Sequence, residues 1–221
     1  TAIPTQQAVT IEYGTIELPA WDLSEALYYS SDLTYPHLDW GLIGGIVSQS
    51  YDTVILRNAY LELTFIPELG GRIYRCVFLP TGQELFYQTP VLKPTHWGPA
   101  DQGWWLAVGG LEFCLPVEEH GYLTAQPWDC TVWINADGSA TARMQCVDTM
   151  RNMSASADVT LPVDAAGFDL AMAITNTGAE TQACQYWVNG MMAPAGDSVT
   201  DDLMIYCPAE SVIVHSRGDD Q

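Results

Sequence analysis

"LRNAYLELTFIPELGGRIYRCVFLPTGQELFY", residues 56–87, holds three apolar, strand-like segments separated by turn-forming residues. The first ends about Arg57-Asn58, the second runs into Pro67, and the third follows Gly70-Gly71. Glycine adopts left-handed backbone conformations that other residues avoid, so a glycine pair suits a tight reversal of the chain. The stretch therefore predicts antiparallel strands joined by short turns.

The same alternation of apolar and polar residues continues along the chain, and turn formers again separate the segments. These separators are Pro80-Thr81-Gly82, Asp137-Gly138, Asn176-Thr177-Gly178 and Pro194-Ala195-Gly196. Such regular spacing of short strands and turns favours an all-β sandwich over a parallel α/β sheet.

Two segments depart from the strand pattern. "DLSEALYYS", which begins at Asp22, could start a helix, with Asp22 as its cap and Glu25 in the first turn. Residues 88–108 hold three prolines and three tryptophans with little periodicity. Long loops within a compact domain usually serve a function, so we expect an aromatic-rich loop that covers one sheet.

The charge of the chain limits its partners. Its 221 residues include 27 acidic and 7 basic side chains, for a net charge of −20. This field repels phosphate, so we expect neither nucleic-acid binding nor attachment to anionic membrane surfaces. Membrane insertion is not expected either, since the sequence lacks an apolar run of transmembrane length. The opening "TAIPTQQ" lacks Met, as in a processed or trimmed chain, and slightly favours a secreted or cell-surface protein over a cytoplasmic one.

Six cysteines show no CxxC spacing, so we predict no zinc site and no other metal site. Cys130 and Cys146 flank a hairpin that turns at Asp137-Gly138, which could place them close enough for a disulfide. Buried free thiols are the alternative. The sequence also lacks GxSxG, P-loop, dinucleotide and HExxH motifs, and we predict no cofactor.

Residues 56–87 resemble the start of galactose-mutarotase-like domains, which share a "P..GG.i" turn and a "G.E.ly" hairpin. One branch is more similar still: an uncharacterised bacterial family often placed ahead of tetratricopeptide repeats. The matching motifs keep their order from about Tyr35 to Asp219 and are "YPHLDW", "WWLAVGGLEFCLPVEEH", "DGSATA", "YWVNGMMAP" and "PAESVIVHSRGDD".

This resemblance implies a β-supersandwich, in which two large antiparallel sheets pack face to face and the concave one holds carbohydrate. It implies a lead-in segment over residues 1–34 and a mutarotase-like domain over residues 35–221, with further domains in the native polypeptide. The family's domain continues beyond the "VHSRGD" motif, so we expect its C-terminal part to be absent. Sugar epimerases of the superfamily carry a histidine before an aromatic-Asn pair and a C-terminal glutamate. Here "ACQYWVNGM" has no histidine, and no such glutamate follows.

Glu112 and His120 are the candidate catalytic residues. Glu112 follows Gly109-Gly110, which permit close backbone approach, and burial among apolar neighbours would raise its pKa and suit it to general acid work. The alternative is a glutamate on the wet face of an edge strand. His120 could bind a sugar hydroxyl or transfer a proton, or it could be a turn histidine bonded to backbone.

The candidate substrate contacts combine aromatic rings with polar groups. Trp104 and Trp105 point to opposite sides of an extended segment, so one can face a sugar while the other packs in the core. The alternative is that both pack in the core. Trp187 and Asn189 are two residues apart on a strand and share a face, where an indole and an amide would suit a sugar.

Two more residues complete the predicted site. Arg72 follows Gly70-Gly71 and could bind a carboxylate or hydroxyl, or pair structurally with Glu68. His215 alternates with Ile213, so it lies on a defined face of its strand and is a ligand candidate.

The sequence thus predicts a carbohydrate-binding or carbohydrate-processing domain, and it leaves open whether the domain is an enzyme. If it is, proton transfer on a sugar is the expected chemistry, as in an epimerase, a glycoside hydrolase or a lyase. One alternative is a non-catalytic structural or protein-interaction module of a larger bacterial protein. Another is an aldose 1-epimerase-like isomerase.

Overall fold

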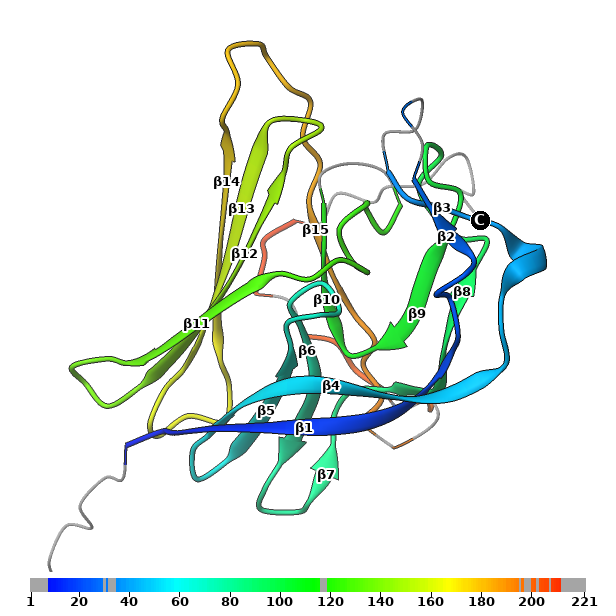
Figure 1. Ribbon diagram of the computed structural model, residues 1–221. Coiled ribbons are helices and arrows are strands. Elements are labelled where there is room, and N and C mark those ends of the chain that lie inside the picture. The colour runs from blue at the N-terminus through cyan, green and yellow to red at the C-terminus, as the bar shows by residue number, and fades with distance from the viewer. Residues whose placement is uncertain are drawn as a thin grey trace, which may run out of the picture.

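The computed structural model describes residues 8–29, 31, 35–115, 119–194, 196, 200–201, 203–206 and 208–211. The described chain is all-β, as predicted, and its strands form a nine-stranded, a four-stranded and a two-stranded sheet (Figure 1). The described residues contain no α-helix, and hence none that is long and apolar enough to cross a bilayer.

The nine-stranded sheet has the order β15-β10-β6-β5-β4-β1-β8-β9, with β7 beside β6. Its strands are β1 (Thr10–Trp21), β4 (Ile46–Arg57), β5 (Leu61–Ile66), β6 (Arg72–Phe78), β7 (Gln83–Glu84), β8 (Gln88–Thr95), β9 (Trp105–Gly109), β10 (Leu111–Cys114) and β15 (Trp187–Gly190). The four-stranded sheet is β11 (Asp129–Ile134), β12 (Ala140–Asp148), β13 (Met153–Leu161) and β14 (Asp169–Asn176) in sequence order. The remaining elements are β2 (Leu27–Tyr28), its partner β3 (His37–Leu38) and the short 3-10 helix η1 (Trp40–Leu42).

The main core lies where the four-stranded sheet faces the larger one. Along β13 every second side chain is buried, from Met153 through Val159 to Leu161. Small residues such as Ala140 and Ala155 let this sheet approach the side chains of β4, β5, β6 and β10 closely. The strict alternation visible in the sequence is therefore the alternation of core and outer face.

The larger sheet is buried on both faces in its central part. A second apolar cluster, which includes Tyr51, Leu92 and Trp104, lies apart from the main core. All four residues of β10 are buried, so this strand has no wet face. The sheet also curves until it nearly closes, because β9 runs into β10 across the single residue Gly110 (Figure 1).

Residues 56–87 form the predicted antiparallel strands β4, β5 and β6, followed by the short β7. The turn at Asn58 is held by its buried side chain, whose Oδ1 accepts from the backbone N–H of Tyr60 and Leu61 at 2.8 and 2.7 Å. Its Nδ2 donates to the carbonyls of Pro162 and Ala165 at 2.7 and 2.8 Å, which ties this turn to the β13–β14 connection.

Two local predictions were wrong. Asp22 begins a turn rather than a helix: its Oδ1 accepts from the N–H of Ser24 at 3.0 Å, and the following residues pair as β2 with β3. Residues 88–108 are not one loop, because they contain β8 and most of β9. β8 pairs with β1 at one register position, Ala20 opposite Leu92, and with β9 at Gln88 and over Lys93–Thr95; Pro90 falls in the gap between these, where the strand has no register partner on β9.

The hairpin at Asp137-Gly138 forms as predicted, but the disulfide does not. Cys130 lies opposite Met144, two residues short of Cys146, and both cysteines are free thiols. The alternative of partly buried free thiols therefore holds for this pair.

Candidate functional site

Pairing between β10 and β15 brings together residues that are far apart in the sequence. Glu112 lies opposite Asn189, and Cys114 lies opposite Trp187. Leu111 and Phe113 point into the main core, so alternation turns the side chains of Glu112 and Cys114 to the other face of the sheet. The side chains of Glu112, Cys114, Trp187 and Asn189 therefore lie next to one another on one face of the sheet.

The glycines ahead of Glu112 are required by the protein's own backbone. Gly109 and Gly110 have φ angles of 101° and 77°, and a Cβ on either would lie 2.3 Å from a carbonyl oxygen, of Tyr87 or Ile73 respectively. The predicted close approach is made within the protein, by the carbonyl groups of Tyr87 and Ile73. The effect is to set the direction in which β10 leaves β9.

Arg72 lies directly behind Glu112 and is completely buried. Its Nε donates to the carbonyl of Leu69 at 2.7 Å, Nη1 to that of Gly109 at 3.0 Å, and Nη2 to that of Thr124 at 2.9 Å. Nη2 also lies 3.4 Å from Oε2 of Glu112. Arg72 was predicted to contact substrate or to pair with Glu68; both were wrong, because its guanidinium is enclosed and its partner is Glu112.

The carboxylate of Glu112 collects several further donors. His120 Nδ1 lies 2.6 Å from Oε1, and the amide of Asn189 donates to the same oxygen at 2.9 Å. The indole N–H of Trp105 donates to Oε2 at 3.2 Å, and the thiol of Cys114 lies 3.4 Å from Oε1. Glu112 is 1% exposed, so these contacts replace the water it has lost.

The pKa of Glu112 moves in the direction opposite to the one predicted. Burial raises it, but the hydrogen bond from His120, the charge of Arg72 and the amide of Asn189 together outweigh burial, and the pKa is lowered below its ordinary value. Glu112 is therefore a fixed anion at neutral pH rather than a proton donor. The sequence-based expectation considered burial without the buried cation.

His120 lies above the buried carboxylate and is itself partly exposed to solvent. Its side chain is 20% exposed, and its ring stacks on Trp105 with centroids 3.9 Å apart and planes 16° apart. Since Nδ1 is engaged by Glu112, Nε2 is the ring nitrogen left for a ligand. A histidine held by a carboxylate on one nitrogen and by an aromatic ring on its face has a fixed orientation.

The other predicted residues divide by position. Trp105 belongs to the cluster, whereas Trp104 is 2% exposed and donates from Nε1 to the carbonyl of Pro36 at 2.9 Å, so it packs in the second core. Trp187 is 39% exposed at the edge of the cluster. His215 lies outside the described residues. Cys114 was missed, although its position two residues after Glu112 was sufficient to place it on the same face.

Glu112, Cys114 and His120 each offer a donor atom, and these atoms lie within 4.8 Å of one another. Two ligands of a tetrahedral metal centre with bonds of about 2.0–2.1 Å stand about 3.3 Å apart. The 2.6 Å between Oε1 and Nδ1 is a hydrogen-bond distance, and Arg72 already offsets the charge of Glu112. In this arrangement the cluster fits a hydrogen-bonded network better than a metal site.

A pocket of about 560 Å³ lies on the opposite side of β9 from this cluster. Trp104 and Leu106 line it, whereas Trp105, between them, points to Glu112. We place the candidate site at the cluster, because buried ionised groups and an oriented histidine gather there. The pocket is a separate feature.

These features define an all-β domain with a buried Arg–Glu pair beneath a partly exposed histidine. Residues 31–220 match the family described as "Domain of unknown function (DUF5107)", and the chain belongs to this family. Among solved structures it is similar to a TPR-domain containing protein from Parabacteroides distasonis ATCC 8503, with 18% identity and a TM-score of 0.64.

The similarity to that structure covers 75% of this chain and 29% of the other, so this chain spans less than a third of that protein. At this identity the likeness concerns the fold alone. The match to a family of unknown function and the similarity to a TPR-domain containing protein agree with the predicted resemblance to an uncharacterised family often placed ahead of tetratricopeptide repeats. The wider relationship to galactose mutarotases stays a prediction.

Proposed function

We propose that the domain binds a carbohydrate over the face formed by His120, Trp187 and Asn189. The observation that carries this proposal is the orientation of His120, with Nδ1 2.6 Å from the buried carboxylate of Glu112 and its ring stacked on Trp105. A pre-oriented polar group beside an exposed indole is what recognition of a sugar requires, because sugars present hydroxyls at their edges and C–H groups on their faces.

The side chains around His120 supply complementary contacts. Trp187, 39% exposed, offers a ring for stacking. Asn189 uses Nδ2 to bind Glu112, and its Oδ1 is an acceptor that remains for a hydroxyl. Within the described cluster, the charge of Glu112 is offset by Arg72, so recognition of a neutral sugar needs no further counter-charge there.

If the domain is catalytic, His120 transfers the proton and Glu112 positions it. Glu112 is buried, ionised and bonded on both oxygens, so a sugar cannot reach it without dismantling the cluster. The imidazole of His120 can act as a proton carrier through Nε2, because Nδ1 is bound to Glu112. The two predicted catalytic residues therefore take unequal roles in this proposal.

An epimerase-like reaction is favoured by one specific contact. This sequence lacks the histidine that sugar epimerases carry before the aromatic-Asn pair. His120 Nδ1, however, lies 3.4 Å from Asn189 Nδ2. A histidine from another segment thus stands beside the asparagine of "YWVN". Single-carboxylate geometry gives no support to a two-carboxylate glycosidase mechanism at this cluster.

The test is a panel of neutral mono- and oligosaccharides and uronic acids, measured by thermal shift and confirmed by calorimetry. We expect at least one sugar to raise the melting temperature, and His120→Ala and Trp187→Ala each to weaken its binding at least about tenfold. His96→Ala is the matched control, because His96 is exposed and its ring stacks on Trp40, whereas that of His120 stacks on Trp105. A panel without any stabilising sugar, or equal binding by wild type and both site variants, contradicts the proposal.

Catalysis is tested on the same proteins by polarimetry of freshly dissolved aldoses and by NMR of the reaction mixtures. Mutarotation that His120→Ala abolishes and His96→Ala preserves indicates an enzyme. Binding without turnover indicates a non-catalytic module.

A structural or protein-interaction role in a larger polypeptide is the second candidate. It is favoured by the similarity to a TPR-domain containing protein of which this chain spans 29%. Its test is the full-length polypeptide: deletion of this domain would abolish assembly with a partner, whereas His120→Ala would leave assembly unchanged.

A further inference from the structure

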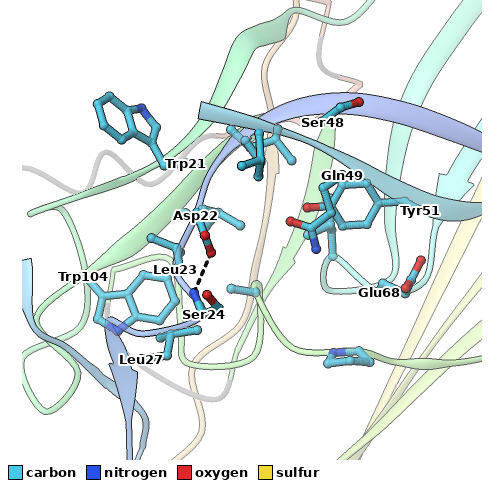
Figure 2. A pocket seen from close by; sticks show the side chains of 17 residues that line it. Trp21, Asp22, Leu23, Ser24, Leu27, Ser48, Gln49, Tyr51, Glu68 and Trp104 are labelled. Atoms are coloured by element: carbon cyan, nitrogen blue, oxygen red, sulfur yellow. Dashed lines mark hydrogen bonds between the residues drawn. The ribbon is translucent and has the colours of Figure 1, made fainter. Parts of the chain in front are cut away.

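The pocket on the other side of β9 combines an apolar floor with an acidic rim (Figure 2). Its floor is formed by buried or half-buried residues of the second core, among them Leu69, Leu92 and Leu106. Its volume of about 560 Å³ is within the range of about 300–1,000 Å³ usual for small-molecule sites.

Two carboxylates from distant segments line this pocket. Asp22 follows β1, and Glu68 lies in the turn between β5 and β6. In Figure 2 the hydrogen bond between Asp22 and Ser24 lies toward one end of the pocket, while Glu68 and Tyr51 lie toward the other. No lysine, arginine or histidine is among the lining residues.

Backbone donors hold both carboxylates in place. Asp22 Oδ1 accepts from the N–H of Ser24 at 3.0 Å, and Glu68 Oε2 accepts from the N–H of Asp52 at 2.7 Å. The first of these bonds lowers the pKa of Asp22, which keeps it ionised at neutral pH. The rim is thus a fixed pair of negative charges, so an incoming cation needs little reorganisation of these side chains.

The aromatic residues Trp21 and Tyr51 also line the pocket. Trp21 is 38% exposed and Tyr51 is 5% exposed. Aromatic faces attract cations through their quadrupole and also pack against apolar groups. Lys93 lines a different, smaller pocket, which shares Trp21 with this one, and it is not among the residues that line the proposed site.

From this combination we propose that the pocket is a ligand site for an organic cation, with an apolar body on the leucine floor and a protonated amine attracted to the carboxylates of the rim, Asp22 and Glu68. The two carboxylates repel an anion and attract a cation, so the rim favours a positively charged ligand over a negatively charged one. The site is independent of the carbohydrate proposal, because Trp104 and Trp105 face opposite sides of the strand.

The experiment compares phenethylamine with its neutral isostere 2-phenylethanol by calorimetry at low salt. We expect the amine to bind at least about tenfold more tightly, and the Asp22→Asn/Glu68→Gln double variant to lose that preference. Added salt should weaken binding of the amine more than that of the alcohol.

Glu12→Gln is the control for the overall negative charge, since Glu12 is exposed on β1 and does not line the pocket. It should leave the preference for the amine unchanged, as should His120→Ala. Thermal unfolding checks that each variant is folded. Equal affinity for amine and alcohol, no binding of the amine, or an equal loss in Glu12→Gln overturns the proposal.

Discussion

Arg72 and Glu112 form an ion pair from which solvent is excluded: Nη2 lies 3.4 Å from Oε2, and the side chains are 0% and 1% exposed. The pair joins the start of β6 to the middle of β10. It also links the backbone of three segments, because the guanidinium binds the carbonyls of Leu69, Gly109 and Thr124. The partly exposed His120 rests on this pair.

Replacing Arg72 by Met should destabilise the fold strongly. The substitution leaves Glu112 buried without its cation and three carbonyls without donors, and breaking a buried pair in this way costs about 3–5 kcal/mol. Urea unfolding at neutral pH measures the loss. Arg72→Met/Glu112→Gln removes both charges and should recover part of it; a loss below about 1 kcal/mol for Arg72→Met would show that the pair is not coupled to the fold.

Glu112 should contribute to the pH dependence of stability on the acid side. Its pKa in the folded state is lowered from the ordinary value of 4.5, so the unfolded chain takes up the proton first as the pH falls. The stabilisation is complete above the ordinary value and is lost as the pH falls through the folded-state value. Wild type should therefore lose stability faster than Glu112→Gln as the pH falls below the ordinary value of 4.5. Parallel curves from denaturant titrations would contradict the lowered pKa.

Asn58 should be critical for the turn between β4 and β5. Asn58→Ala removes four hydrogen bonds at a site 8% exposed, and with each net bond worth about 1 kcal/mol we expect a loss of about 2–4 kcal/mol. Asn176→Ala is the comparison, since Asn176 also bonds to backbone, at Gly178 and Glu180, but is exposed. Chemical denaturation of both variants checks the difference, and equal losses would count against the role of burial.

Comparison of Gly110→Ala with Gly103→Ala separates the cost of an unfavourable backbone conformation from the cost of a steric clash. Both glycines have φ 77°, so the conformational cost, about 1–2 kcal/mol, is common to both variants. A Cβ at Gly103 meets nothing within 4 Å, whereas at Gly110 it would lie 2.3 Å from the carbonyl oxygen of Ile73. Thermal unfolding should show a much larger loss for Gly110→Ala. A similar loss in both would mean that the β9–β10 junction can open.

Structural features that depend on residues close together in the chain were predictable from the sequence. Alternation along Met153–Leu161, the turn at Asp137-Gly138 and the strands around Gly70-Gly71 depend on neighbours within a few positions. β8 was not predicted because of its prolines; Pro90 lies where the β8–β9 register is interrupted, and such an irregularity cannot be located from the sequence.

The sequence by itself determined an all-β chain, the face of each regular strand and the residue types available for a site. Only the tertiary structure decided which of them meet. Glu112 and Asn189 are 77 residues apart and share a register position, and the approach of Arg72 reverses the expected direction of the Glu112 pKa. Charge interactions act through space and depend on burial, so no periodicity along the chain records them.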